Sequence, residues 1–106
     1  MIGAQLNLNY VDINKPVKEI RQIAASYQEG KGINEIKKQI DDVIRDFSAT
    51  LQRNQVYRYL VWSEMLTELE LYFSNKADPR WLDAMNHARY RVKSRRQTAI
   101  NSRKKI

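Results

Sequence analysis

Residues 33–51 read INEIKKQIDDVIRDFSATL and carry the plainest structural signal in the chain. Apolar side chains recur there at intervals of three and four residues, at Ile33, Ile36, Ile40, Val43, Phe47 and Leu51. Charged side chains fill the positions between them, among them Lys37, Lys38, Asp41, Asp42, Arg45 and Asp46. This spacing is typical of an amphipathic helix, so the segment predicts a helix with one face in a core.

The chain that follows is expected to turn back and form a second long helix. No Gly or Pro occurs from Ile33 to Asn75, but one helix over that range would span about 63 Å, longer than a compact domain of this size. The polar run QRNQ at 52–55 is the predicted turn, with Asn54 as a left-handed cap. The helix expected over Val56–Asn75 is apolar almost all round, which is typical of a central bundle element or of half an interface.

The N-terminal part predicts an extended arm and a short helix. Residues 4–10 alternate between apolar and polar, the period of a strand. We interpret residues 1–13 as an arm that packs over the core; pairing with a strand of another chain is the alternative. Asn14 or Asp12 then caps a helix with Pro16 in its first turn. The apolar positions of this helix are Val17, Ile20, Ala24 and Tyr27. The helix is expected to end at Gly30-Lys31-Gly32.

The last helix is expected to open at Asp78-Pro79, where a capping carboxylate precedes a first-turn proline. Its apolar stripe is Trp81, Met85, Ala88, Val92 and Ala99. Together these elements predict an all-α fold, an antiparallel bundle of about four helices that forms one domain over residues 1–106. We expect the core to bury Phe47, Leu51, Trp62 and Trp81.

Composition narrows the class of protein. Apolar residues make up 42% and charged residues 29% of 106 residues, a globular balance. Cysteine is absent, which excludes disulfides and thiolate chemistry. The first residues lack the charged and apolar regions of a secretory signal, and no apolar run approaches the roughly 20 residues of a membrane span. We therefore expect a cytoplasmic protein with no membrane span.

The net charge of +7 is concentrated at the C-terminal end. Residues 84–106 contain no Asp or Glu and eight basic residues: Arg89, Arg91, Lys93, Arg95, Arg96, Arg103, Lys104 and Lys105. The other 83 residues hold 11 basic and 12 acidic groups and carry a net charge of −1. A nearly neutral body with a cationic C-terminal helix and tail indicates a local binding surface.

Helical spacing places these cations beside the apolar stripe. Arg89, Lys93, Arg96 and Arg103 fall on one flank, and Arg91 and Arg95 fall on the other. Charge complementing the helix dipole accounts only for about the last turn. We therefore predict that all eight residues bind the phosphates of a nucleic acid, RNA or DNA, ahead of an acidic membrane surface or an acidic protein. Tyr90, His87, Gln97 and the segment Tyr57-Arg58-Tyr59 are candidate minor contacts.

No constellation of catalytic residues stands out. The acids Asp41, Asp42, Asp46, Glu64 and Glu68 suggest a metal site in the bundle, but such a site needs a Glu-x-x-His pattern that the sole histidine, His87, does not complete. We interpret them as surface acids in salt bridges. There is no Gly-rich phosphate loop and no Cys/His cluster. We expect no enzyme activity, no metal and no cofactor.

In outline, the chain resembles the small helical subunits of CRISPR surveillance complexes. The resemblance is carried by the basic segment from Arg89 to Lys105 and by the apolar helix over Val56–Asn75. It implies an accessory subunit that lines a nucleic acid and contacts neighbouring protein subunits or copies of itself. Size and helicity are also similar to those of bacteriocin immunity proteins and of phage or plasmid inhibitor factors, which implies a protein–protein module instead. No functional residues are carried over from any of these families.

Overall fold

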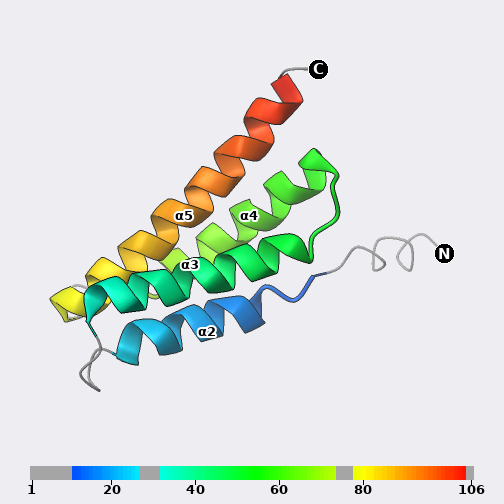
Figure 1. Ribbon diagram of the computed structural model, residues 1–106. Helices are drawn as coiled ribbons and strands as arrows, with labels where there is room; N and C mark the ends of the chain where they lie inside the picture. The colour runs from blue at the N-terminus through cyan, green and yellow to red at the C-terminus, as the bar shows by residue number, and fades with distance from the viewer. Residues whose placement is uncertain (1–10, 27–31, 74–77, 105–106) are drawn as a thin grey trace.

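The computed structural model describes residues 11–26, 32–73 and 78–104, with side chains up to residue 101. This part of the chain forms four helices and no strand: α2 (Asn14–Ala25), α3 (Ile33–Ala49), α4 (Gln55–Glu70) and α5 (Pro79–Lys104). Successive helices run in opposite directions, and the α2–α3 pair packs on the α4–α5 pair (Figure 1). The predicted all-α class is confirmed. Most of the predicted arm, residues 1–10, lies outside the described residues.

Helix α5 is the central element of the fold, because its contacts with the other three helices are the most extensive, above all those with α4. Its inward face consists of Ala84, Met85, Ala88, Val92 and Ala99, all at most 2% exposed. The three alanines let the neighbouring helices approach closely, since interaxial distance depends on the side chains at the contact. The predicted stripe is thus confirmed except at Trp81, which is half-buried at the edge while Ala84 occupies the inside.

Helix α3 differs from its predicted register in its second half. The buried positions are Ile36, Ile40, Ile44 and Ser48, followed by Leu51 in the turn. Val43 and Phe47 were expected in the stripe but are only half-buried. The reason is that α3 packs against both α2 and α5. The residues of α3 that face the core therefore recur every four positions, and these two side chains lie at the edge of the core.

Two of the four residues expected in the core are fully buried. Trp62 is 1% and Leu51 is 6% exposed, as predicted. The expectation was wrong for Phe47 and Trp81, which pack against the core from its edge. Phe47 meets Trp62 edge-on with ring centroids 5.5 Å apart, and Trp81 meets Phe73 at 6.4 Å. Aromatic rings of this size close the two ends of a small core without being enclosed themselves.

The helix starts follow the predicted chemistry. The Asp78 carboxylate accepts a hydrogen bond from the Arg80 backbone N–H at 2.8 Å, as expected for a helix that opens at Asp78-Pro79. At α2 the Asp12 carboxylate accepts from the Asn14 N–H at 3.0 Å, so Asp12, not Asn14, supplies the capping oxygen.

The helix ends differ from those predicted from the sequence. Asn54 is not a left-handed cap at the end of α3; its backbone is extended and its side chain accepts from the Tyr57 N–H at 3.0 Å, which makes it the N-cap of α4. Helix α2 ends at Ala25, and residues 27–31, which include Tyr27, Gly30 and Lys31, lie outside the described residues. Helix α4 ends at Glu70 instead of Asn75.

Arg58 fastens the turn between α3 and α4. Its guanidinium donates to the carbonyls of Gln52 at 2.7 Å and Leu51 at 3.3 Å and to the Ser48 hydroxyl at 3.5 Å. A cation at this position also complements the C-terminal dipole of α3. Tyr57 and Tyr59 are half-buried, and burial raises the pKa of the Tyr57 hydroxyl. The segment 57–59 is therefore part of the fold and not the exposed contact patch suggested by the sequence.

Truncation of Trp62 tests the position of the core. We expect Trp62→Ala to lower the free energy of unfolding by about 3–5 kcal/mol, because the indole is almost completely enclosed. Phe47→Ala should cost less, because part of its ring faces solvent. Urea denaturation followed by circular dichroism measures both. A Phe47→Ala penalty equal to or above that of Trp62→Ala would contradict this description of the core.

Candidate nucleic-acid interface

Five of the eight basic residues singled out in the sequence have described side chains, and all five lie beside the buried face of α5. Arg89 and Arg96 lie on the side of α4, and Arg91 and Arg95 lie on the side of α3. This agrees with the two flanks expected from helical spacing. The side chains of Arg103, Lys104 and Lys105 are outside the described part.

The flank on the side of α4 is partly neutralised. Arg89 Nη1 lies 3.5 Å from Glu70 Oε2, and its guanidinium lies 5.0 Å from the centre of the Phe73 ring. Arg96 stands over Tyr59 at 6.0 Å, and no carboxylate within the described residues pairs with it. Lys93, between them, is exposed and likewise has no ion-pair partner in the described part.

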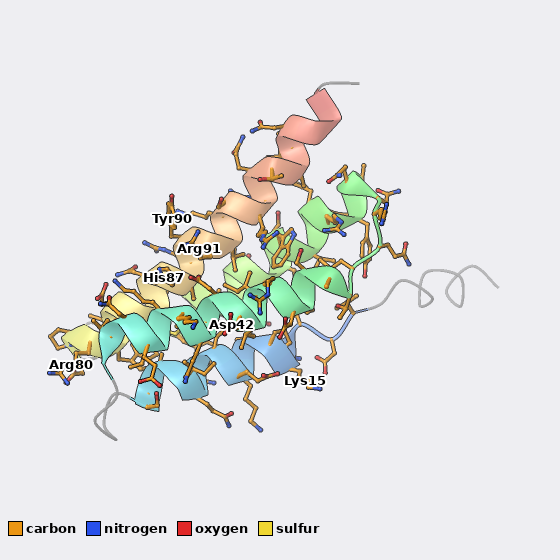
Figure 2. All side chains as sticks on the ribbon, in the orientation of Figure 1. Lys15, Asp42, Arg80, His87, Tyr90 and Arg91 are labelled. Carbon is orange, nitrogen blue, oxygen red and sulfur yellow. The ribbon has the colours of Figure 1, made fainter. Side chains whose placement is uncertain are left out.

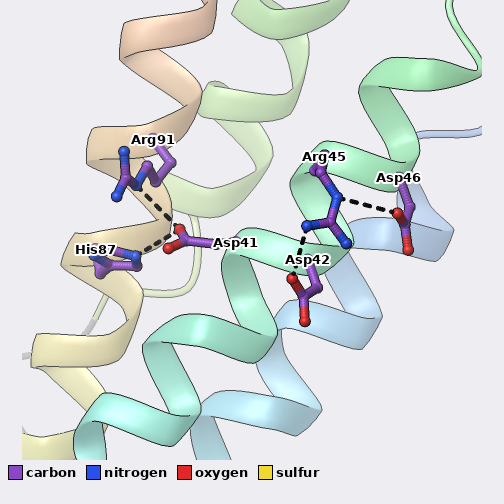
Figure 3. Close-up of polar contacts among 6 residues, drawn as sticks. All are labelled: Asp41, Asp42, Arg45, Asp46, His87 and Arg91. Carbon is purple, nitrogen blue, oxygen red and sulfur yellow. Dashed lines mark hydrogen bonds and ion pairs between the residues drawn. The ribbon is translucent and has the colours of Figure 1, made fainter.

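The flank on the side of α3 is organised by Asp41. His87 Nε2 donates a hydrogen bond to Asp41 Oδ1 at 2.7 Å, and Arg91 Nε reaches the same oxygen at 3.0 Å (Figure 3). The His87 side chain is only 16% exposed. Asp41 thereby ties α3 to α5 at two successive turns of α5. Sequence reasoning missed this link, because 46 residues separate Asp41 from His87 and no local spacing relates them.

Beyond Asp41, α3 and α5 diverge (Figure 1). Side chains of the two helices line an open groove of about 440 Å³ there. Among the described residues that line it, the buried Ile44 is apolar, and the others are Asp41, Arg45, Arg91, Ser94, Arg95 and Thr98. Arg45 is held on its own helix by Asp42 at 3.2 Å and Asp46 at 3.6 Å (Figure 3). Arg95 has no ion-pair partner in the described part of the chain.

The middle of the outward face of α5 is polar, and the exposed cations Arg91, Lys93 and Arg95 lie to either side of it. A shallow depression there is lined by α5 residues alone: Tyr90, Lys93, Ser94, Arg96, Gln97, Thr98 and Asn101. Tyr90 is 65% exposed and lies next to Arg91 (Figure 2). The cations border this polar strip on either side, because the central position of α5 turns its flanks toward α3 and α4.

The acidic residues singled out in the sequence are surface groups. Asp41, Asp42 and Asp46 all take part in ion pairs, as expected, whereas Glu64 and Glu68 have none within the described residues. In the same part of the chain, no three His, Asp or Glu side chains gather closely enough to hold a metal ion. None of the described helices combines the length and apolar character that crossing a bilayer requires.

Comparison of the chain with protein-family models, with curated proteins and with solved structures gives no match. The class of protein is therefore defined by the fold and the site alone. It is a four-helix protein, in its described part, whose central helix carries cations on both flanks, some paired with neighbouring carboxylates and others left without them.

The shared carboxylate of Asp41 makes a testable contribution to stability. We expect Asp41→Asn to lower the free energy of unfolding by about 1 kcal/mol, because the charge-assisted bonds to His87 and Arg91 are partly screened by solvent. Asp42→Asn is the matched control on the same helix and should change stability by less than about 0.5 kcal/mol, since it loses only an exposed pair. Urea denaturation compares them, and equal losses would contradict the linking role of Asp41.

Proposed function

We propose that the protein is a non-catalytic accessory protein that binds the sugar–phosphate backbone of RNA or DNA through the flanks of α5. The observation that supports this most strongly is the pair Lys93 and Arg95. They lie on opposite flanks of the helix, and neither has a carboxylate partner among the described residues. Both flanks therefore carry positive charge that the described part of the chain does not neutralise, and a polyanion supplies the missing negative charge.

The cations that do have partners remain available to a stronger ligand. The Arg89–Glu70 and Arg91–Asp41 pairs involve side chains that are 36–48% exposed, and such pairs contribute at most about 1 kcal/mol. A phosphate offers the planar guanidinium two acceptor oxygens in a favourable geometry. Replacing the carboxylate by a phosphate therefore costs little free energy at both positions.

The arrangement favours binding without base-specific contacts. Residues four apart on one flank, such as Arg91 and Arg95, are about 6 Å apart along the axis, which suits contacts to successive backbone phosphates. Contacts to phosphate position a protein but carry no sequence information. A small subunit of a CRISPR surveillance-type ribonucleoprotein in the cytoplasm is the setting that this combination fits best.

Neutralisation of the two unpaired cations tests this proposal. We expect Lys93→Gln/Arg95→Gln to keep the fold and to weaken binding of fluorescent oligonucleotides of different sequence by a similar factor. The slope of log affinity against log salt concentration should fall by about two, because each substitution removes one cation that binds a phosphate. Fluorescence anisotropy between low and physiological salt measures this slope.

The matched control removes the same charge elsewhere. Lys15→Gln/Lys18→Gln changes two exposed lysines that belong to α2 and to neither flank of α5. We expect this variant to bind as the parent does. If both double variants bind equally well, net charge and not the α5 flanks governs binding, and the proposed function is wrong.

A protein–protein module is the second candidate, and the outer face of α4 favours it. Val56 is 44%, Leu60 59% and Leu71 69% exposed along this side, although α4 also buries Trp62, Met65 and Leu69. Large apolar side chains in solvent are frequent at sites that contact another subunit. The partner is either another protein subunit or a second copy of this chain.

A polar substitution on α4 separates the two candidates. If α4 joins copies of this chain, Leu60→Gln should shift sedimenting dimers toward monomers, with little response to salt because the contact is apolar. The same variant should leave oligonucleotide binding unchanged, since α4 presents this side away from α5. Oligonucleotide binding that falls with Leu60→Gln as much as with Lys93→Gln/Arg95→Gln would contradict the assignment of separate surfaces.

A further inference from the structure

The residues that line the groove between α3 and α5 indicate a more specific ligand than a polyanion in general. Arginines reach it from two helices, Arg45 from α3 and Arg91 and Arg95 from α5, while Asp41 is the one acid among its described lining residues. Its volume of about 440 Å³ is within the range of small-molecule sites, roughly 300–1,000 Å³. The groove therefore has room for a unit the size of a nucleotide.

The donors of this groove are only partly used within the protein. Arg91 contacts Asp41 through Nε, and its two terminal amino groups have no hydrogen-bond partner in the described part. The whole Arg95 guanidinium is likewise unengaged among the described residues. Arg45 makes two exposed ion pairs on its own helix, which a phosphate replaces at little cost. Three guanidinium groups around one open space match the oxygens of a phosphate.

Tyr90 adds an aromatic surface beside these donors. Of the four tyrosines with described side chains it is the most exposed, at 65%. The Tyr72 ring is covered by the Arg21 guanidinium at 3.6 Å, and Tyr57 and Tyr59 are half-buried. Tyr90 lies 6.0 Å from the guanidinium carbon of Arg91, which itself lines the groove (Figure 2). A flat ring in solvent next to a phosphate-binding group is the combination used to hold an unpaired base.

We propose that the α3–α5 groove is a binding site for single-stranded nucleic acid, with a backbone phosphate between Arg45, Arg91 and Arg95 and a base stacked on Tyr90. This inference rests on the proposed function and names its ligand. A duplex keeps its bases stacked on one another, so it offers phosphates to the groove but no base to Tyr90. The site therefore distinguishes a single strand from a duplex without reading sequence.

The test compares a fluorescent 12-nucleotide oligothymidylate with a 12-base-pair duplex by anisotropy at one fixed salt concentration. We expect the single strand to bind more tightly and Tyr90→Ala to weaken it by about tenfold, the loss expected for one stacked base. Tyr90→Phe should retain the parent affinity because it keeps the ring. Binding of the duplex should not respond to either variant.

Arg45 provides the matching test on α3. Arg45→Gln should weaken binding of the single strand, whereas Arg53→Gln, which removes an exposed arginine from the turn after α3, should not. Circular dichroism verifies that each variant is folded, as expected for residues outside the core.

The outcomes separate this inference from the proposed function. Equal or tighter binding of the duplex, or parent-like binding of the single strand by Tyr90→Ala, overturns the single-strand site while salt-dependent binding through α5 still holds. Loss of affinity with Arg53→Gln equal to that with Arg45→Gln also overturns it, because the effect is then one of net charge. Absence of salt-dependent binding to either probe overturns both proposals.

Discussion

Burial of one narrow face of α5 is the constraint on which the rest of the structure depends. The face consists of Ala84, Met85, Ala88, Val92 and Ala99 and lies against the other three helices. A helix that holds this many cations can occupy the centre of a bundle only if none of them lies on the buried face. A charge buried there without a partner would be strongly destabilising. The cations of α5 from Arg89 to Arg96 accordingly lie outside this buried face.

The neighbouring helices then decide how much of that charge is neutralised. Each flank meets one carboxylate, Glu70 from the end of α4 and Asp41 from the middle of α3. At 26 residues, α5 is also longer than α3 with 17 and α4 with 16, and its C-terminal turns extend past the end of α3 (Figure 1). Lys93 and Arg95 lie nearer the middle of α5 and have no ion-pair partner within the described residues, and they support the proposed role in nucleic-acid binding.

The divergence of α3 and α5 has a physical origin in their contacts. Asp41, in the middle of α3, holds the two helices together through His87 and Arg91 of α5. Farther along, the turn stabilised by Arg58 keeps the end of α3 close to the start of α4, while α5 runs away from α3. The groove opens between them, and the arginines of two helices reach it together.

Local patterns determined much of this protein: the all-helical class, the start of α5 at Asp78-Pro79, the burial of Leu51 and Trp62, and the two cationic flanks. These follow from helical periodicity and capping, which depend on residues a few positions apart. Tertiary packing alone decided the bond between Asp41 and His87, the half-burial of Phe47, the internal use of Arg58 and the groove that joins Arg45 to Arg95. Each of these depends on the angle and offset between helices distant in the chain, and no local spacing encodes either quantity.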